Sequence, residues 1–268
     1  MIEIAYAKIN LALHVRRRRG DGYHELETLF AFVDFGDRLT AEPAARDELH
    51  VTGEFAGALE DPFGNVVAKA LNSLPHGRGW RVTLDKRLPV AAGLGGGSAD
   101  AGAVFRMIEC DCGLPDNWLE KAAKLGADVP ACVASVACIG TGTGTDLAPL
   151  DDDLAGLWAL LVNPRLPLAT GPVFKAWDTI DRGQLPTGSA RVIAQAGRND
   201  LASPAQELCP PIGEVLAALA DTQPWLSRMS GSGATCFGLY ESEAETAAAQ
   251  DQLAAAHPDW WYATGALR

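Results

Sequence analysis

The chain has 268 residues, of which 48% are hydrophobic and 21% are charged, and this composition is typical of a folded globular protein. Its formal net charge of −12, from 22 Lys and Arg against 34 Asp and Glu, argues against non-specific binding to a nucleic-acid backbone. The longest nearly apolar run, residues 129–139, is too short to cross a bilayer, so we expect no membrane-spanning segment.

The six cysteines include no C-x-x-C pair, and the sequence opens directly on a strand-like pattern without a signal peptide. We therefore expect free thiols and a cytoplasmic protein. The five histidines show none of the spacings that are typical of a zinc site, so we expect no zinc site built from protein ligands.

The N-terminal residues 2–15, IEIAYAKINLALHV, alternate in the manner of a β-strand. Tyr6, Lys8 and Asn10 share one face of this strand, because side chains repeat every two residues. Burying a lysine ammonium without a partner is costly, so we expect Lys8 to meet an anion. The four arginines at 16–19 are interpreted as a solvated loop between two strands, with attraction of an anionic ligand as the alternative.

The first half of the chain then reads as short elements separated by turns. The predicted elements are a turn at 21–24, strands at 25–40 and 81–86, a loop at 61–64, and helices at 65–74, 99–110 and 117–126. The low-complexity run GTGTGT at 140–145 resembles a second phosphate loop, but no helix with a good start signal follows it. We therefore favour a hairpin or strand edge there.

The second half of the chain follows an acidic segment at 151–153, which we interpret as a domain junction. The predicted elements are strands at 157–163, 226–229, 234–240 and 260–266, and helices at 171–178, 211–222 and 243–256. Their order predicts a split βαβ arrangement in an α+β domain. The sequence therefore predicts two domains, residues 1–150 and 151–268.

A glycine-rich loop, residues 89–99 (PVAAGLGGGSA), lies between a strand and a helix. Backbone N–H groups at a helix N-terminus point outward without partners, and the helix dipole favours negative charge there. Glycines let this backbone approach an anion without a Cβ clash. The loop therefore predicts a phosphate-binding site, with Ser98 as the helix N-cap, in preference to a flexible connector.

The glycine-rich loop does not match the common nucleotide or hydrolase signatures. It lacks the Gly-Lys-Ser/Thr end of a Walker A loop and the third glycine of the dinucleotide fingerprint. The Gly-x-Ser-x-Gly nucleophile elbow is absent from the chain, which argues against an α/β-hydrolase. These exclusions leave a phosphate site of another type.

Three motifs in order identify the chain as similar to the GHMP kinases. AYAKINLAL (5–13) resembles their N-terminal strand motif, the glycine-rich loop resembles their Pro-x3-Gly-Leu-Gly/Ala-Ser-Ser-Ala motif, and MSGSGATCFGLY (229–240) resembles their C-terminal glycine motif. The loop departs from the family pattern at Ala99, where many members carry a second hydroxyl. Three ordered motifs over residues 5–240 make a chance match improbable.

The resemblance narrows within the family at three further segments, namely GDGYHELETLFAFVDFGD (20–37), LGADVP (125–130) and GRNDL (197–201). They look like members that use ATP to phosphorylate the 2-hydroxyl of a cytidine diphosphate-linked methylerythritol in non-mevalonate isoprenoid synthesis. The resemblance covers nearly the entire chain. It implies an α+β, two-domain fold, with an N-terminal domain like domain 2 of ribosomal protein S5 and a ferredoxin-like C-terminal domain.

The resemblance implies that Lys8 and Asp128 act at the reacting hydroxyl, Asp128 as base and Lys8 as its electrostatic partner. Such a role fits phosphoryl transfer, which needs positioning and charge neutralisation. From the residues alone, Asp128 has the alternative of a turn residue satisfied by the backbone. The alternative for Lys8 is a lysine at a strand edge with its ammonium in water.

The resemblance also implies a cytidine site formed by Asn10, Tyr23, His24, Thr170 and Phe174. An aromatic ring stacks on a base, and an imidazole hydrogen-bonds the edge of a base. The two aromatics would lie on opposite sides of the cytidine, with hydrogen bonds from Asn10 and His24. For Tyr23 and His24, an aromatic cover over a turn is the alternative.

ATP and Mg²⁺ are the cofactors that the resemblance implies, although it assigns no residue here as a metal ligand. The expected ATP-binding residues are Asn65 and Lys86 near the adenine, with Pro89, Gly93, Leu94, Gly95, Gly96, Gly97, Ser98 and Ala99 in the glycine-rich loop. A helix N-cap and an exposed strand-end lysine are the alternatives for Asn65 and Lys86.

Two other functions stay open at this point. The first is a small-molecule GHMP kinase that acts on homoserine or a mevalonate-type alcohol, and residues 20–37 argue against it. The second is a nucleotide-binding regulator or S5-like RNA-binding module, against which Lys8, Asp128 and the net charge argue. We expect a small-molecule substrate, no nucleic acid or membrane partner, and a monomer or weak dimer.

Overall fold

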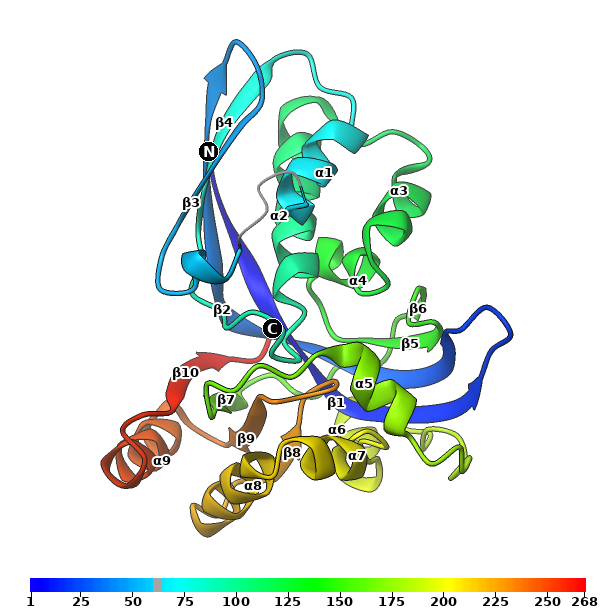
Figure 1. The fold of residues 1–268 in the computed structure, drawn as a ribbon, viewed down its shortest axis with the longest axis vertical. Coiled ribbons are helices and arrows are strands. Elements are labelled where there is room, and N and C mark those ends of the chain that lie inside the picture. Colours follow the sequence, from blue (N-terminus) through cyan, green and yellow to red (C-terminus); the bar gives the residue numbers. More distant parts are fainter. Residues whose placement is uncertain (60–63) are drawn as a thin grey trace.

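The computed structural model describes residues 1–59 and 64–268, which form two sheets flanked by helices (Figure 1). The loop predicted at 61–64 lies outside the described residues except for Gly64. The first sheet has the strand order β3-β4-β2-β5-β6, with β1 paired to β2, and the second has the order β10-β7-β9-β8. The second order is that of a ferredoxin-like sheet, with neighbouring strands antiparallel, as the βαββαβ pattern predicts.

The elements of the first half are β1 (Ile2–Arg18), β2 (His24–Ala44), β3 (Glu48–Thr52), η1 (Ala56–Ala58), α1 (Val66–Ser73), β4 (Gly79–Asp85), α2 (Gly96–Cys112), α3 (Trp118–Leu125), α4 (Val129–Ala134), β5 (Cys138–Gly142) and β6 (Asp146–Ala148). The elements of the second half are β7 (Trp158–Asn163), α5 (Thr170–Ala176), α6 (Ala190–Ala196), α7 (Ala202–Leu208), α8 (Pro211–Asp221), β8 (Leu226–Met229), β9 (Cys236–Tyr240), α9 (Glu243–Ala256) and β10 (Trp261–Ala266). None of the helices within these ranges is long and apolar enough to cross a membrane.

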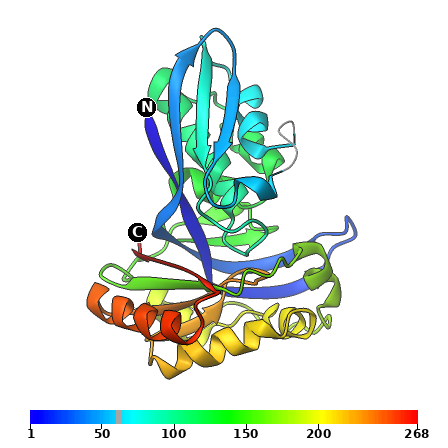
Figure 2. The ribbon, with the colours of Figure 1, turned by 60° about the vertical axis from the view of Figure 1, so that its left-hand side comes forward.

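The longest elements are β1 and β2, which pair antiparallel from Ile2↔Thr40 to Arg18↔His24. In both ribbon views β1 runs from the half of the molecule that carries α1–α4 to the half that carries α8 and α9 (Figures 1 and 2). The strands predicted at 2–15 and 25–40 are therefore confirmed. The middle of β1 lies where the two halves meet, which places its polar residues between them.

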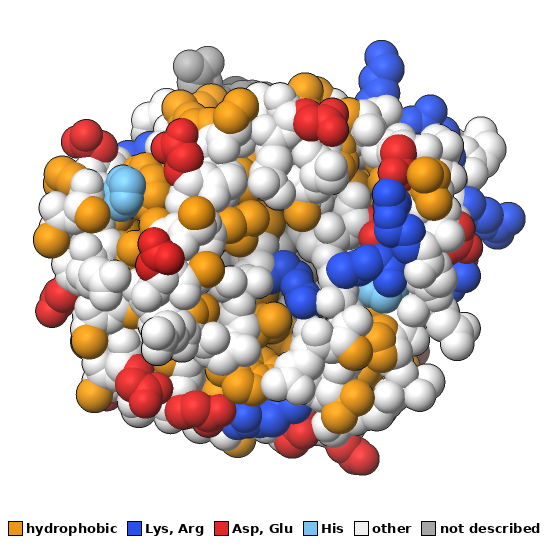
Figure 3. All heavy atoms as spheres, turned by 90° about the horizontal axis from the view of Figure 1, so that it is seen from below, with side chains coloured by type: hydrophobic (Ala, Val, Ile, Leu, Met, Phe, Trp, Pro, Cys, Tyr) orange, Lys and Arg blue, Asp and Glu red, His pale blue; other side chains and the backbone are white. Residues whose placement is uncertain are grey.

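The prediction of a loop at 16–19 is wrong for the first three arginines, which continue β1. Arg17 pairs with Glu25 across the two strands, and the Arg16 guanidinium lies 2.5 Å from the Glu27 carboxylate. Opposite charges on neighbouring strands stabilise a sheet, so acidic residues of β2 neutralise this basic run. On the face seen from below, Lys and Arg side chains gather on the side where the β1–β2 hairpin ends (Figure 3).

Three buried apolar layers hold the elements together. One lies between the first sheet and α1–α4 and includes Phe105, and another lies between the second sheet and its helices and includes Val215. The third joins the two sheets, because Ile9 and Leu161 belong to the same buried cluster. Burial of this kind drives folding and fixes the two halves against each other. The first sheet ends at β6 and the second begins at β7, while a domain boundary at residue 150 stays a prediction.

The hairpin favoured at 140–145 is confirmed, because β5 and β6 pair antiparallel around that run. The sequence pattern did not predict β3, α4, α6 and α7, which have between five and seven residues each. Short elements have little propensity of their own and depend on tertiary packing. They are therefore the elements that a periodicity argument is least able to find.

The start of α2 corrects one prediction about the glycine-rich loop. The N-cap of α2 is Gly95 with a φ of 62°, and no side chain caps the helix. Ser98 lies within the first turn, so its predicted role as the N-cap is wrong. Glycine adopts this left-handed conformation without strain, and the helix can therefore begin a turn earlier than a serine cap would allow. The first-turn N–H groups of α2 receive no capping side chain.

Candidate active site

A cavity of about 1180 Å³ brings together segments that are far apart in the sequence. Its lining includes most of the predicted site residues, namely Lys8, Asn10, Tyr23, His24, Asn65, Lys86, Pro89, Gly93, Gly95, Gly96, Gly97, Ser98, Asp128, Thr170 and Phe174. Leu94 and Ala99 do not line it, because their side chains are buried in the core. Any contact of these two residues with ATP would have to use their backbone.

Lys8 lies at the centre of β1 and is 4% exposed. Its ammonium lies 3.1 Å from Oδ2 of Asp128 and donates a hydrogen bond of 2.8 Å to Oδ1 of Asn10. The expectation that Lys8 meets an anion is therefore confirmed. A buried ammonium between two oxygen acceptors is held in one place, since the long side chain has few other positions that satisfy its charge.

Asp128 occupies the N-cap position of α4 but makes no capping hydrogen bond with its side chain. The alternative of a turn carboxylate satisfied by the backbone therefore does not hold. Its side chain is 30% exposed, points one oxygen at Lys8 and lines the cavity. A carboxylate that is paired on one side and accessible on the other can still accept a proton from a ligand.

Asn10 is fixed by Thr28, which the sequence analysis did not single out for the site, and by Ser230 of the C-terminal glycine motif. Its Nδ2 donates to Oγ1 of Thr28 over 2.8 Å, and its backbone N–H donates to Oγ of Ser230 over 3.2 Å. Thr28 in turn donates to the carbonyl of Ala12. This network sets which way the Asn10 amide faces, and so it points Oδ1 at Lys8. Both hydroxyl residues lie within quoted motifs, which is the only signal the sequence offered.

The glycine-rich loop packs closely on this network. A Cβ added at Gly95 would lie 3.0 Å from Cε of Lys8 and 3.6 Å from Oδ2 of Asp128. At Gly93, which has a φ of 79°, a Cβ would lie 2.2 Å from the carbonyl oxygen of Ser230. Only glycine fits at Gly93, and at Gly95 the left-handed φ of 62° and the close Lys8 side chain favour glycine. The N-terminus of α2 is consequently adjacent to the Lys8–Asp128 pair, so an anion bound at the helix start would lie beside these two groups.

Lys86 is buried beneath the start of α2, so the alternative of an exposed strand-end lysine is wrong. Its ammonium forms ion pairs with Asp37 and Asp100, and although burial opposes the charge, these carboxylates hold the pKa of Lys86 above its usual value. Burial raises the pKa of Asp100 to about 7. Two carboxylates already neutralise the Lys86 ammonium, and a contact between Lys86 and adenine stays a prediction.

Asn65 caps α1, because its Oδ1 accepts a hydrogen bond of 2.9 Å from the backbone N–H of Val67. The N-cap interpretation is confirmed. The residue also lines the cavity, and its capping bond leaves the Nδ2 donors for other partners. An adenine contact through this amide stays a prediction.

The aromatic end of the cavity forms around His24, which begins β2. The ring of His24 lies 4.9 Å from that of Phe174 and 5.8 Å from that of Trp177, which the sequence analysis did not single out. Burial lowers the pKa of His24 below 6.5, with the charge of Arg18 adding to the effect. Tyr23, in contrast, is 64% exposed at the mouth of the cavity. Both residues line the cavity, so a flat ligand at this end can contact both rings.

Thr170 begins α5 and connects the aromatic end of the cavity to the C-terminal turn, which we define as residues 230–233. The hydroxyls of Thr170 and Ser232 form a hydrogen bond of 2.9 Å. The glycine-rich loop and the aromatic end thus belong to one cavity, which is larger than the 300–1,000 Å³ typical of a small-ligand pocket. It can accommodate two ligands whose reactive ends meet near Lys8.

Comparison with known proteins agrees with this geometry. Residues 63–136 match the family described as GHMP kinases N terminal domain, and residues 186–259 match GHMP kinases C terminal. The 4-diphosphocytidyl-2-C-methyl-D-erythritol kinase of Novosphingobium aromaticivorans is 69% identical over 99% of this chain and 92% of its own length. The protein of that name from Erythrobacter litoralis is 62% identical over 99% of both.

Solved structures give the same assignment. A crystal structure of 4-(cytidine 5'-diphospho)-2C-methyl-D-erythritol kinase superposes with a TM-score of 0.82 and 33% identity over 99% of both chains. A homoserine kinase from Cytophaga hutchinsonii, with a TM-score of 0.63 and 16% identity over 98% of this chain and 95% of its own, shares the fold alone. The chain therefore belongs to the 4-diphosphocytidyl-2-C-methyl-D-erythritol kinases, a family of the GHMP kinases.

Proposed function

We propose that this kinase transfers the γ-phosphoryl group of ATP to the 2-hydroxyl of 4-diphosphocytidyl-2-C-methyl-D-erythritol, with Asp128 as the base and Lys8 as its electrostatic partner. The activity follows from membership of the family, and the roles of the residues are our inference. The observation that carries the roles is the 3.1 Å contact between Lys8 and Asp128 beside Gly95. In this contact an ammonium and a carboxylate lie next to the N-terminus of α2, where we expect the phosphates of ATP.

The proposed reaction has one displacement and one proton transfer. The substrate 2-hydroxyl loses its proton to Asp128, and its oxygen forms a bond to the γ-phosphorus as the bond to the bridging oxygen of ADP breaks. Lys8 stabilises the negative charge of the carboxylate and of the developing alkoxide. The backbone N–H groups at the start of α2 hold the transferred group. The products are the 2-phosphate and ADP.

The cytidine moiety is assigned to the aromatic end of the cavity. His24 is supported by Phe174 and Trp177, and its lowered pKa keeps the ring neutral at pH 7, so one ring nitrogen can accept and the other can donate. Tyr23 at the mouth offers a face for stacking on the base. Asn10 and Thr170 lie between this end and Lys8, where the sugar and the phosphates of the substrate would pass.

The residues present fit a Mg²⁺ ion that accompanies ATP. Mg²⁺ retains several waters and takes most other ligands from phosphates, so it needs only one or two side-chain oxygens. The Ser98 hydroxyl lines the cavity in the first turn of α2 and would hold the ion together with phosphate oxygens and waters, which leaves the Asp128 carboxylate available as the base. When bound there, Mg²⁺ would neutralise charge on the phosphate oxygens.

A coupled assay of ADP release tests the proposed function. The purified kinase should turn over 4-diphosphocytidyl-2-C-methyl-D-erythritol, while homoserine and mevalonate should give no release above background. The Asp128→Asn protein should bind both substrates and turn over slowly. Equal rates with homoserine would contradict the assigned substrate, and full activity of Asp128→Asn would contradict the assigned base.

A further inference from the structure

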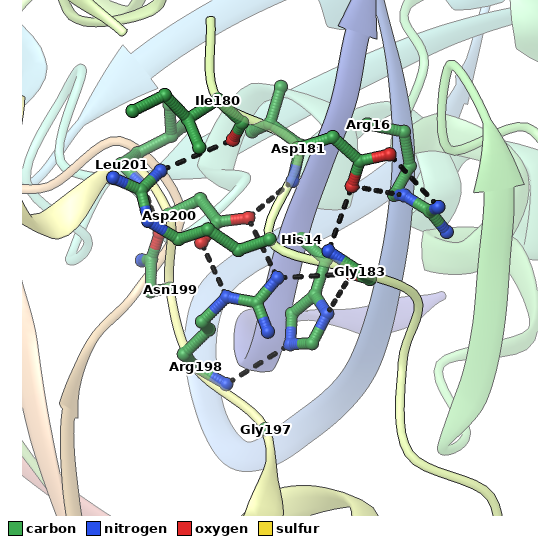
Figure 4. Close-up of polar contacts among 12 residues, drawn as sticks. His14, Arg16, Ile180, Asp181, Gly183, Gly197, Arg198, Asn199, Asp200 and Leu201 are labelled. Atoms are coloured by element: carbon green, nitrogen blue, oxygen red, sulfur yellow. Dashed lines mark hydrogen bonds and ion pairs between the residues drawn. The ribbon is translucent and has the colours of Figure 1, made fainter. Parts of the chain in front are cut away.

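The segment GRNDL, residues 197–201 (Figure 4), lies alongside β1 through an isolated parallel bridge between Leu13 and Asn199, and we call this segment the strap. The backbone N–H of Leu13 donates to the carbonyl of Arg198 over 2.7 Å, and the N–H of Asp200 donates to the carbonyl of Leu13 over 2.9 Å. The strap begins at Gly197, where a Cβ would lie 2.6 Å from Cβ of Ala12. The chain of the second half therefore lies directly on the strand that carries Lys8.

Side chains at both ends of the strap fix its position. Oδ2 of Asp200 accepts a hydrogen bond of 2.9 Å from the N–H of Val15, and the other carboxylate oxygen accepts one of 2.7 Å from Nε of Arg198. Nε2 of His14 accepts a hydrogen bond from the N–H of Arg198, as Figure 4 shows. With both ends held, the residue between them has a defined orientation relative to β1.

That residue is Asn199, which is 8% exposed and uses its whole side chain. Its Nδ2 donates two hydrogen bonds of 2.8 Å, one to the carbonyl of Met229 and one to that of Gly231. Its Oδ1 accepts a hydrogen bond of 2.9 Å from the N–H of Leu201. The amide therefore joins the strap to the C-terminal turn, because its acceptors are backbone atoms just before that turn and within it.

The C-terminal turn is in direct contact with the glycine-rich loop. Oγ of Ser230 donates to the carbonyl of Gly93 over 2.8 Å, and a Cβ at Gly231 would lie 3.1 Å from that same carbonyl oxygen. Just after the turn, the N–H of Thr235 donates to the carbonyl of Ala92 over 3.1 Å. Gly231 also lines the cavity. A displacement of the turn would therefore move the loop that leads into α2.

We propose that Asn199 is a positioning residue for ATP, which sets the place of the glycine-rich loop through the C-terminal turn. Asn199 is not among the described residues that line the cavity, so we expect it to act through the turn and not by contact with a ligand. The Asn199 amide bonds the carbonyls of Met229 and Gly231 and so holds the turn against the strap. Ser230 of the turn bonds Gly93 of the glycine-rich loop. Because the strap is bonded to β1, the turn and the loop keep a fixed position relative to Lys8. The proposal rests on the proposed function, in which this loop binds the phosphates of ATP.

The test is Asn199→Asp, which keeps the shape of the side chain and removes both donors. A carboxylate would then face two carbonyl oxygens, so the turn should move away from the strap. We expect the KM for ATP to rise by about tenfold or more, because a buried polar group without a partner costs roughly one factor of ten or more in an equilibrium. The KM for the cytidine substrate should rise by a smaller factor than the KM for ATP. The turn bonds Asn10 and Thr170, but the base would be held by His24 and Phe174 at the aromatic end of the cavity.

A pH profile separates positioning from a general loss of stability. When the carboxyl group introduced by Asn199→Asp is protonated, it can donate one hydrogen bond. The ratio of the KM for ATP in this variant to that in the natural protein should therefore fall as the pH is lowered. Asn199→Ala has no such donor, and its ratio should not change with pH. If Asn199→Asp fails to fold, Asn199→Ala replaces it in the test. A raised KM for ATP in Asn199→Ala then supports the proposal, and an unchanged KM for ATP in Asn199→Ala overturns it.

Asp200→Asn is the matched control, because its amide oxygen can still accept the hydrogen bond from the N–H of Val15, so that the strap stays on β1 and only the charge of the ion pair with Arg198 is lost. It should lower the Tm and leave the KM for ATP unchanged. An equal rise of that KM in both variants, or no rise in Asn199→Asp, would overturn the role of Asn199.

Gly95→Ala distinguishes failure of the positioning role of Asn199 from failure of the proposed function, in which the glycine-rich loop binds the phosphates of ATP. If Gly95→Ala raises the KM for ATP while Asn199→Asp does not, only the positioning inference fails. If neither raises it, the phosphate-binding role of the loop fails.

Discussion

The Lys8 ammonium lies 3.1 Å from the Asp128 carboxylate, across the gap between the central strand β1 and the start of α4. The two residues lie far apart in the sequence, and only the packing of α2 and α4 on β1 brings them together. Lys8 is almost fully buried, while Asp128 keeps one face on the cavity. This difference in exposure supports our proposal that Asp128, the accessible group, accepts the proton and that Lys8 gives electrostatic support.

Substitution of either residue should abolish most of the turnover without unfolding the protein. We expect Asp128→Asn, Asp128→Ala and Lys8→Ala to lower kcat by about 10²–10⁴, the range for loss of a positioned proton acceptor. The Tm of Asp128→Asn should fall only slightly, because the asparagine oxygen can still accept from the Lys8 ammonium and the side chain makes no capping bond. Steady-state kinetics with thermal melting checks both statements. Near-normal turnover from both positions would refute the assigned roles.

The glycines of the glycine-rich loop differ in how much space they have, and this difference gives a matched pair of variants. At Gly95 a methyl group would lie 3.0 Å from Cε of Lys8, at a left-handed φ of 62° that costs an alanine roughly 1–2 kcal/mol. At Gly97 the nearest contact is an ordinary 3.6 Å to Val66. Gly95→Ala should therefore lower kcat/KM for ATP by at least about tenfold, while Gly97→Ala should change it less than about threefold. Comparable losses in both would mean that steric space near Lys8 is not the cause.

His24→Ala should weaken the binding of the cytidine substrate more than that of ATP. The imidazole packs between Phe174 and Trp177 at the end of the cavity away from the glycine-rich loop. Removing it deletes a stacking surface and a hydrogen-bonding edge, each worth about 1 kcal/mol, so the KM for the cytidine substrate should rise about tenfold or more. Measuring both KM values decides the matter, and equal increases for the two substrates would contradict the assignment.

Stability should fall as the pH is lowered below 6.5, because burial lowers the pKa of His14 below that value, with the charge of Arg198 adding to the effect. In the folded protein Nδ1 of His14 bonds the carbonyl of Gly183 and Nε2 accepts from Arg198, which suits the neutral ring. The unfolded chain therefore binds the proton first as the pH falls, and the free energy of unfolding decreases by at most about 1.4 kcal/mol per pH unit for each such group.

Denaturant unfolding between about pH 7.5 and 5.5 tests whether His14 causes the loss of stability, with His14→Gln as the comparison. Glutamine can replace both hydrogen bonds and does not titrate, so the decrease should be smaller in the variant. The pKa of His24 shifts in the same direction, and the double variant should flatten the profile further. A pH dependence that is unchanged in both variants would show that other groups control stability in this range.

The sequence alone determined the elements that have strong periodicity and clear end signals. The alternation of 2–15 appears as β1, and the helices predicted at 99–110 and 117–126 appear as α2 and α3, although α2 begins three residues earlier. It also determined the family, because three motifs in a fixed order identify the loop, the central strand and the C-terminal turn. These are local properties that depend on side-chain spacing and backbone freedom, so they can be recognised in the sequence without knowledge of tertiary contacts.

Only the tertiary structure decided how the site is assembled. In the folded chain Lys8 pairs with Asp128, and Lys86 is buried between two carboxylates. The Asn199 amide donates to two backbone carbonyls. The tertiary structure also corrected Ser98, because a glycine in the left-handed region starts α2 before a serine cap is needed. Each of these outcomes depends on which residues lie near one another after folding. The sequence shows which residues carry charges and hydrogen-bond donors. Folding decides their partners, because burying a polar group without a partner costs free energy.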